Sequence, residues 1–379
     1  MAAFTEQLIT WRREFHRTPE CGNAEFETTQ RLRDILEAHD ITILDVPLKT
    51  GLIAEIGQGD TFVAVRSDID ALPIIEQTDL PYASEKQGAM HACGHDIHMA
   101  AVLGTALRLK AREATLPGRV RLIFQPAEEV SEGADQVVQT GVLEGAKAIV
   151  GFHNDPTLPV GTWRAKAGYM TANVDRFKID ITGVGAHAAM PQDGVDPHII
   201  LSQLISGIQT IVSRNVAPYE EAVVTIGQVH SGETWNVIPS QGMIEGTVRT
   251  LTPEVRALVE TRMQKLCDGL AVQFDASVSL DYQRLTDGVN NDEVLQTLAW
   301  QVAEETGYDV QQQPRAQMIG EDFASYQQVA PVHFAMIGSD SAYPLHHPKY
   351  APNEAILDKV PYYFVNFVER LFERATQNV

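Results

Sequence analysis

Cysteine, basic residues and long apolar runs are scarce in this chain of 379 residues, and each scarcity excludes a class of protein. Only three cysteines occur, an odd number that argues against a disulfide framework and is typical of a reducing compartment. The 29 basic residues face 50 acidic ones, and the formal charge of −21 repels phosphate backbones and anionic membrane surfaces. No stretch approaches the roughly eighteen consecutive apolar residues of a transmembrane helix. We therefore expect a folded protein that binds neither nucleic acid nor membrane.

The N-terminal segment predicts an amphipathic helix rather than a secretory signal. Charged residues such as Glu6, Arg12 and Arg13 interrupt its apolar residues, whereas a signal requires a continuous apolar region. Together with the few cysteines, this pattern predicts a cytoplasmic protein. The length of 379 residues and the apolar fraction of 44% are typical of a globular chain of roughly two to three domains.

The order of expected elements predicts an α/β domain that a smaller domain interrupts. Up to about residue 170, helical patterns alternate with short β-rich runs, which is typical of a sheet with crossover helices. From 173 to 286 the order becomes β-α-β-β-α-β, the split arrangement of ferredoxin-like α+β domains. We therefore predict a larger domain from residues 1–172 and 287–379, with the smaller domain, 173–286, inserted into it.

Three of the β-rich runs lead directly into polar clusters, at residues 66–70, 125–129 and 153–155. In α/β sheets of this kind, ligands bind outside the carboxyl ends of the strands. We therefore expect the functional site of the larger domain at that edge of its sheet.

The segment MHACGHDIHMA, residues 90–100, is the strongest local signal for a metal site. It holds thiol, imidazole and carboxyl groups, which bind transition-metal ions, at His91, Cys93, His95, Asp96 and His98. For Asp96 and His98, a role in capping or bracing the following helix is an equally good interpretation. No second cysteine lies close enough for redox chemistry of the CxxC kind.

Two adjacent glutamates, Glu128 and Glu129, follow an apolar strand and a proline. Neighbouring carboxylates at such a place raise each other's pKa unless a cation lies close by. Successive residues of an extended segment point in opposite directions, so one carboxylate can bind a metal while the other handles a proton. A solvated pair of glutamates is the alternative. With His153, His346 and His347, the donors exceed a single tetrahedral site and fit a dinuclear one.

Nine motifs in order span nearly the whole chain: RRxxHxxPE at 12–20, RSDIDALPI at 66–74, MHACGHD at 90–96, FQPAEE at 124–129, GxHAAMPxxGVDP at 185–197, WNVIP at 235–239, GTVRT at 246–250, GEDF at 320–323 and LHHP at 345–348. With these motifs, the chain resembles the dinuclear metal amidohydrolases of the aminoacylase, hippurate hydrolase and auxin-conjugate hydrolase group. The similarity is strong toward bacterial N-acyl-amino-acid deacetylases, including those acting on N-acetylcysteine.

This resemblance implies a mixed central sheet flanked by helices, with the inserted domain serving as a lid and dimerisation domain. It also implies two divalent metal ions per subunit, for which zinc, manganese, cobalt and nickel are all suitable. The Cys93 thiolate would bridge the two ions. His346 is preferred to His347 because related sequences keep histidine only at the first of the two positions. The implied ligands are Cys93, His95, Glu129, His153 and His346.

The remaining roles also come from the resemblance. Glu128 is implied as the general base that takes a proton from water and passes it to the departing amine. His187 is expected to stabilise the oxyanion, from the partner subunit of a homodimer. Asn236 and Arg249 are expected to bind the substrate carboxylate with His187, and Asp70 is expected to support a metal ligand.

The implied function is metal-dependent hydrolysis of the amide bond of N-acyl L-amino acids, chiefly N-acetyl ones, which releases a carboxylic acid and a free amino acid. A dipeptidase or carboxypeptidase and an N-acetyl-diaminopimelate deacetylase are the enzyme alternatives. A more remote alternative is an inactive protein that binds acyl amino acids or peptides. Glu128 beside an intact ligand set argues against it, because a binding protein needs no base.

Overall fold

The computed structural model describes residues 2–377, and the chain forms two compact units. Unit 1 comprises Met1–Met170, Val289–Arg315 and Asp322–Val379, and unit 2 comprises Thr171–Gly288 and Ala316–Glu321. The main boundaries differ by two residues from those that the sequence predicts. The segment Ala316–Glu321 was expected in the larger domain, but it packs with unit 2.

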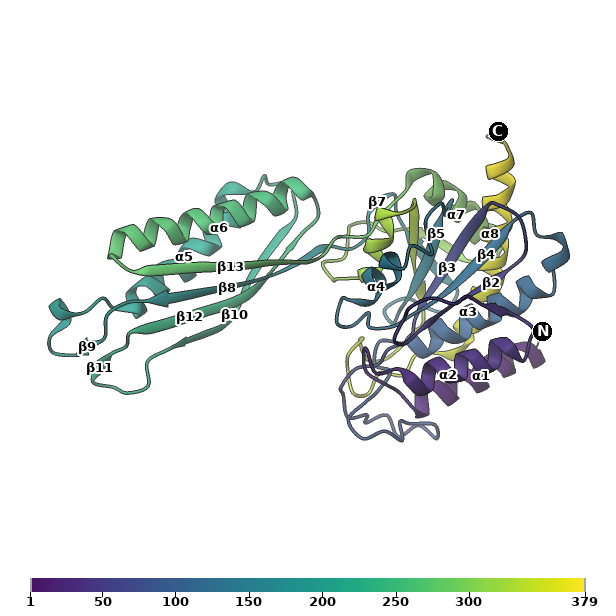
Figure 1. The fold of residues 1–379 in the computed structure, drawn as a ribbon, viewed down its shortest axis with the longest axis horizontal. Helices are drawn as coiled ribbons and strands as arrows, with labels where there is room; N and C mark the ends of the chain where they lie inside the picture. Colours follow the sequence, from purple (N-terminus) through teal and green to yellow (C-terminus); the bar gives the residue numbers. More distant parts are fainter. Residues whose placement is uncertain (1, 378–379) are drawn as a thin grey trace. The chain divides into compact units, whose positions relative to one another are not determined.

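Unit 1 contains an eight-stranded mixed sheet in the order β1-β2-β4-β3-β5-β16-β6-β15 (Figure 1). Strands β4, β3, β5 and β16 run parallel, so their carboxyl ends lie at one edge of the sheet. The predicted mixed α/β sheet is thereby confirmed. The strands are β1 (Thr42–Ile43), β2 (Leu52–Ile56), β3 (Phe62–Asp68), β4 (Arg119–Gln125), β5 (Ile149–Asp155), β6 (Thr162–Ala165), β15 (Asp309–Gln312) and β16 (Val332–Gly338).

Helices flank this sheet, and one of them is almost entirely buried. In α3, 13 of 16 residues are buried, because α1 and α8 pack against it in addition to strand β3. Residues at the start of α3 are therefore held rigidly next to the strand ends. The helices of unit 1 are α1 (Ala2–Arg17), α2 (Phe26–Glu37), α3 (His95–Lys110), α4 (Gly133–Gln139), α7 (Glu293–Glu305) and α8 (Val360–Gln377), with 3-10 turns at Glu113–Thr115, Asp322–Gln328 and Glu354–Asp358.

Unit 2 contains a four-stranded antiparallel sheet in the order β10-β12-β8-β13 and two helices. Along the chain the elements follow as β-α-β-β-α-β, which agrees with the predicted order. Alternate residues of β8 are buried, because both helices share one hydrophobic core with one face of the sheet (Figure 1). The elements are β8 (Asn173–Thr182), α5 (Pro197–Asn215), β10 (Ala222–Ser231), β12 (Gln241–Thr250), α6 (Pro253–Phe274) and β13 (Ser277–Thr286).

Two short ribbons were not predicted from the sequence. In unit 2, β9 (Ala186–His187) pairs with β11 (Val237–Ile238), and in unit 1, β7 (Gly168–Tyr169) pairs with β14 (Asn290–Asn291). Two-residue strands carry too little pattern to be recognised in a sequence. A further 3-10 turn lies at Pro191–Asp193. Among residues 2–377, no helix has both the length and the apolarity that crossing a membrane requires.

Candidate metal centre

The five predicted ligands come from four separate segments at the carboxyl edge of the unit 1 sheet. His153 lies on β5, Glu129 follows β4, and His346 lies in the loop after β16, while Cys93 and His95 lie where α3 begins. The donor atoms of Cys93, His95 and His153 lie within 4.8 Å of one another, as do those of Cys93, Glu129 and His346. Cys93 belongs to both groups and thus lies between them, which is the place expected for a bridging thiolate.

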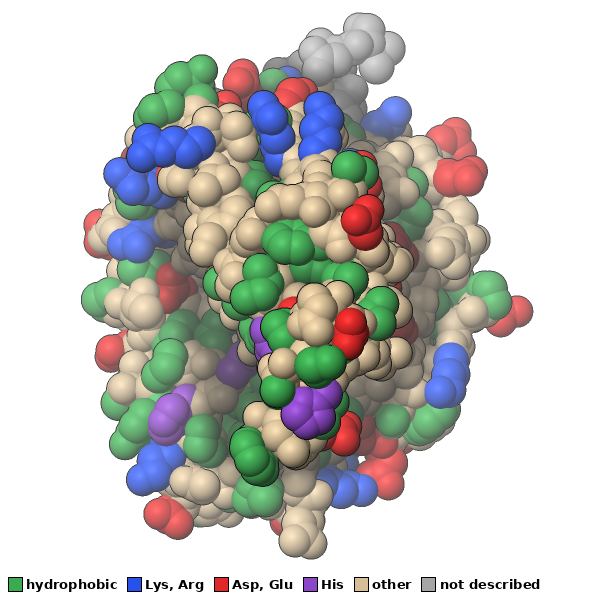
Figure 2. All heavy atoms as spheres, turned by 90° about the vertical axis from the view of Figure 1, so that its left-hand side faces the viewer, with side chains coloured by type: hydrophobic (Ala, Val, Ile, Leu, Met, Phe, Trp, Pro, Cys, Tyr) green, Lys and Arg blue, Asp and Glu red, His purple; other side chains and the backbone are tan. Residues whose placement is uncertain are grey.

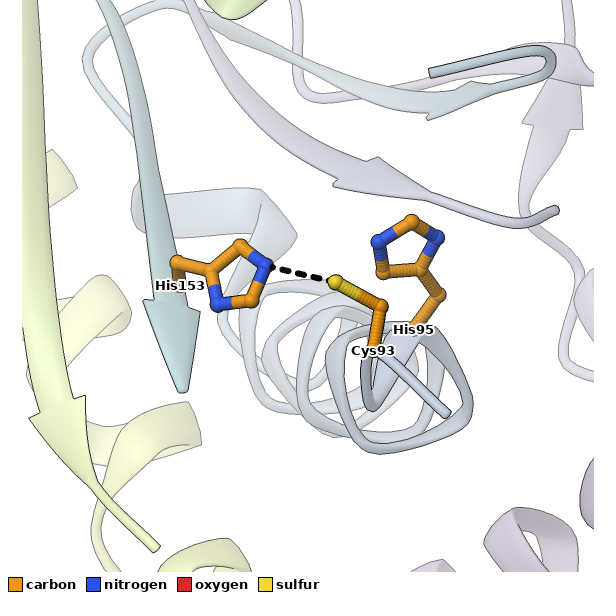
Figure 3. Close-up of side chains that lie close together, drawn as sticks. All are labelled: Cys93, His95 and His153. Atoms are coloured by element: carbon orange, nitrogen blue, oxygen red, sulfur yellow. Dashed lines mark hydrogen bonds between the residues drawn. The ribbon is translucent and has the colours of Figure 1, made fainter. Parts of the chain in front are cut away.

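The sulfur of Cys93 lies between two imidazole rings (Figure 3). Its distance to His153 Nε2 is 3.3 Å, and His153 Nδ1 donates to the backbone oxygen of Asn154 at 2.7 Å. This second bond fixes the ring with Nε2 toward the sulfur. Burial, with a contribution from the carboxylate of Glu129, raises the pKa of the Cys93 thiol well above its ordinary value. A thiolate at this buried position therefore needs a cation beside it.

Two donor atoms at the centre of the site have no hydrogen-bond partner among the described residues. They are His95 Nε2 and Glu129 Oε1, both buried and 4.0 Å apart. The Nε2 atom of His346 lies 3.5 Å from the same Glu129 oxygen. A buried polar atom that lacks a partner costs about 1–3 kcal/mol, and a cation held by these two atoms would offset that cost. Thiolate, imidazole and carboxylate donors around these atoms fit divalent transition-metal ions.

Asp70 lies where the sequence predicts a residue that supports a ligand. His95 Nδ1 donates to the Asp70 backbone oxygen at 2.9 Å and lies 3.2 Å from its carboxylate Oδ1. The other carboxylate oxygen, Oδ2, accepts the backbone N–H of Glu129 at 3.0 Å. One aspartate thus orients two of the predicted ligands, His95 through its ring and Glu129 through its backbone.

Glu128 lies beside this ligand set. One of its carboxylate oxygens is within 4.8 Å of donor atoms of His95 and Glu129, and the backbone N–H of Asp322 donates to its Oε1 at 3.5 Å. The side chain is partly exposed, in contrast to the buried His95. Glu128 is therefore open to water while it remains next to the cation-binding groups, as a general base requires.

The structure separates the two C-terminal histidines. His346 approaches Glu129 and Cys93, whereas His347 stacks on Tyr343 with ring centroids 4.5 Å apart and accepts the backbone N–H of Lys349. His346 has a φ of 64°, in the left-handed region that residues with a Cβ rarely adopt. This geometry favours His346 as the ligand.

Asp96 and His98 lie outside the groups that contain Cys93 and Glu129. Asp96 is buried and pairs with Arg12 at 2.7 Å and His16 at 2.8 Å, while His98 Nδ1 contacts Asp68 at 2.6 Å. Both side chains brace the start of α3, which is the second interpretation that the sequence allowed. The ring nitrogens of His91 are buried without hydrogen-bond partners among the described residues.

Sequence reasoning gave no role to a buried network that holds the strand ends. Asp322 accepts hydrogen bonds from the Gln125 side chain at 2.8 and 2.9 Å, from the Ala134 backbone at 2.9 Å and from Arg66 at 3.0 Å. Asn154 donates to the backbone oxygen of Cys93 at 2.7 Å. The available signal was Asp322 within the GEDF motif, but its partners lie up to about 250 residues away.

Of the three predicted substrate-binding residues in unit 2, two lie together. His187 pairs with Val237 in the β9–β11 ribbon, and the backbone oxygen of Asn236 accepts the N–H of Ala188 at 3.2 Å. Arg249 lies near the other end of unit 2, on β12, where it is half-buried and bonds to Thr247. Burial lowers the pKa of Arg249 from its ordinary value.

Comparisons with known proteins agree with this arrangement. The model of peptidase family M20/M25/M40 matches residues 64–370. The N-acetylcysteine deacetylase of Bacillus subtilis (strain 168) is 45% identical over 377 residues, which cover 98% of both chains. The N-acetyldiaminopimelate deacetylase of Geobacillus thermodenitrificans (strain NG80-2) is 37% identical, over 95% of this chain and 96% of the other. A solved structure from Bacillus subtilis, a dinuclear metal-binding peptidase of the M20 family, is 42% identical with a TM-score of 0.88, over 98% of this chain and 99% of the other.

Proposed function

This chain belongs to peptidase family M20/M25/M40, and from that premise we propose that it removes the acetyl group from N-acetyl-L-amino acids. It is a metal-dependent hydrolase of amide bonds. The observation that carries the proposal is that five donor side chains lie close together, with Glu128 beside them. Two of their buried donor atoms, His95 Nε2 and Glu129 Oε1, have no hydrogen-bond partner among the described residues. Similarity to an N-acetylcysteine deacetylase at 45% identity supports a small N-acetyl amino acid as substrate.

The proposed roles follow from the positions of the side chains. Cys93, His95, Glu129, His153 and His346 would hold two divalent ions. When bound, such ions supply Lewis acidity, which lowers the pKa of water and polarises the amide carbonyl.

Proton transfer falls to the residue beside the ligands. Glu128 accepts a proton from the water molecule as the water oxygen attacks the amide carbon. It then donates that proton to the amide nitrogen as the carbon–nitrogen bond breaks. Acetate and the free amino acid are the products.

We also propose that the active protein is a homodimer in which two subunits complete each site. Arg249 and Gln241 lie eight residues apart on β12, which is about 27 Å at the usual strand rise. The β9–β11 ribbon, with His187 and Asn236, lies beyond the Gln241 end (Figure 1). This separation far exceeds the length of an N-acetyl amino acid. Arg249 and the pair His187 and Asn236 therefore contact one substrate only if they come from different subunits.

The surface of unit 2 supports this proposal. The end that carries β9 and β11 exposes histidine and hydrophobic side chains side by side (Figure 2), and Trp235 there is 93% exposed. Strand β10 is an edge strand with Val223 and Val229 exposed, and the neighbouring helix α5 exposes Ile199 and Ile205. An edge strand and apolar residues next to it favour pairing with a second copy.

Because Cys93 must remain a thiolate, we further propose a reducing compartment, the cytoplasm.

A second candidate substrate is N-acetyldiaminopimelate, because a relative named N-acetyldiaminopimelate deacetylase is 37% identical over nearly the whole chain. The test is acetate release by the purified protein from N-acetyl-L-cysteine, N-acetyl-L-methionine, N-acetyl-L-diaminopimelate and a dipeptide. We expect the N-acetyl amino acids to be cleaved and Glu128→Gln to abolish turnover while metal content is retained. No hydrolysis of any of these compounds by metal-loaded protein would favour the binding-protein alternative, and full activity of Glu128→Gln would exclude Glu128 as the base.

A further inference from the structure

The turn that carries Glu128 contains two non-glycine residues in a left-handed conformation. Ala127 has a φ of 54° and Ser131 a φ of 58°, and the two adjacent glutamates lie between them. This region of backbone space is unfavourable for any residue with a Cβ, and such outliers gather at functional sites where the surroundings enforce them. Contacts from outside the turn must therefore hold it in this shape.

The contact that holds Ala127 comes from a distant segment. The Glu25 side chain is fully buried, and its Oε1 accepts the Ala127 backbone N–H at 2.8 Å. The other oxygen of Glu25 accepts the Thr50 hydroxyl at 2.8 Å, which fixes the orientation of the carboxylate. The Ala127 carbonyl oxygen accepts the N–H groups of Glu132 and Gly133 at 3.2 and 3.1 Å. Both backbone polar groups of Ala127 are thus bonded in this one arrangement.

The position of Glu25 shows that its carboxylate serves this turn rather than its own helix. Glu25 is the residue before α2, yet its side chain makes no capping hydrogen bond there. Glu20 accepts the backbone N–H groups of Glu27 and Thr28 instead, at 3.1 and 2.8 Å. The Glu25 carboxylate is therefore available for Ala127.

Close packing leaves the turn little room for another shape. A Cβ on Gly22 would lie 3.2 Å from the Ala127 Cα, and a Cβ on Gly133 would lie 1.6 Å from the Pro126 carbonyl oxygen. Both glycines allow backbone segments to approach the turn more closely than a side chain would permit.

We infer that Glu25 is a positioning residue for Glu128: through the Ala127 N–H it holds the turn in the conformation that places the general base beside the ligand side chains. This inference rests on the proposed function of Glu128. Glu128 follows Ala127 directly, so a change in the Ala127 dihedral angles redirects its side chain. The ligands Cys93, His95 and His153 come from other segments, and Asp70 holds the Glu129 backbone independently.

A double-mutant cycle tests this inference, because glycine adopts the left-handed conformation without the penalty that alanine has. In the native background, we expect Glu25→Ala to lower kcat at least tenfold, with KM changed less than threefold and metal content retained. In the Ala127→Gly background, the same substitution is expected to lower kcat less than threefold. Glu25→Gln, which keeps an acceptor oxygen for the Ala127 N–H, is expected to retain at least a third of native kcat.

The matched control is Glu20→Ala, which removes a partly exposed hydrogen-bond acceptor from the same segment but leaves the turn intact, and kcat should stay within threefold of native. Equal loss of kcat from Glu25→Ala in both backgrounds, or loss of metal together with activity, would overturn the positioning role. So would an undiminished kcat of Glu25→Ala. Glu128→Gln is measured in parallel: if it stays active, the proposed base is wrong, whereas an inactive Glu128→Gln with an unaffected Glu25→Ala contradicts only the inference about Glu25.

Discussion

A mixture of two inactive variants should recover activity if Asn236 acts in the site of the partner subunit. Gln241 at the start of β12 and Arg249 near its end are about 27 Å apart along the strand, and Asn236 lies beyond Gln241. We propose that Asn236 acts in the partner's site and Arg249 in the site of its own subunit. Glu128→Gln removes the base of one subunit, whereas Asn236→Ala damages only the neighbouring site.

The size of the recovery follows from random pairing. Equal amounts of the two variants, dissociated and reassembled, give heterodimers in about half of the dimers, and each heterodimer has one intact site of two. We therefore expect about a quarter of the native kcat from Glu128→Gln mixed with Asn236→Ala, although each variant alone is nearly inactive.

The matched control exchanges Asn236→Ala for Arg249→Ala. Because Arg249 serves its own subunit, every site in that mixture lacks either the base or the arginine, so no recovery is expected. The assay is acetate release from the best N-acetyl amino acid. Recovery in the Arg249 mixture, or none in the Asn236 mixture, would refute the assignment, and a monomeric protein in light scattering would refute the dimer itself.

Three further predictions concern single positions. Asp70→Ala should weaken metal affinity about 10–100-fold, because His95 and Glu129 lose a shared partner; equilibrium dialysis measures this, and unchanged affinity would contradict the supporting role. Burial lowers the pKa of His333 to about 3, whereas the pKa of histidine in the unfolded chain is about 6.5. The contribution of this histidine to stability is therefore fully present above pH 6.5 and is lost as the pH falls below that value, because the unfolded chain then binds a proton that the folded one does not. From pH 7 to pH 5, this histidine should lower the free energy of unfolding by about 2 kcal/mol. Urea denaturation should therefore show that the free energy of unfolding of His333→Phe declines by about 2 kcal/mol less than that of the native protein over this pH range. An equal decline in both proteins would show that His333 is not neutral in the fold. Gly133→Ala should destabilise the protein by more than about 2 kcal/mol, because its Cβ would meet the Pro126 carbonyl oxygen, and an unchanged melting temperature would contradict this.

Local pattern predicted the larger features of the fold because they depend on neighbouring residues. The buried strands β3, β5 and β16 are rich in apolar residues, and the strand-end rule brought Glu129 and His153 to one edge of the sheet. The preference for His346 over His347 needed the family resemblance, because nothing in LHHP itself distinguishes its two histidines.

Features that depend on distant contacts could not be predicted in this way. Asp322 joins Arg66 across 256 positions, and Glu25 joins Ala127 across 102. An alanine gives no sign in the sequence that it adopts a left-handed conformation. These contacts appear only when the chain is folded, since packing rather than local preference determines them.

The most direct test is to measure bound metal and acetate release together as metal is added back to chelated protein. We expect no turnover without metal, a rise with added zinc, manganese, cobalt or nickel, and a plateau near two ions per chain, with Glu128→Gln binding the same amount while remaining inactive. Full activity of the metal-free protein would contradict a dinuclear centre built on Cys93. So would a Cys93→Ala variant that binds as much metal as the native protein and reaches the same activity.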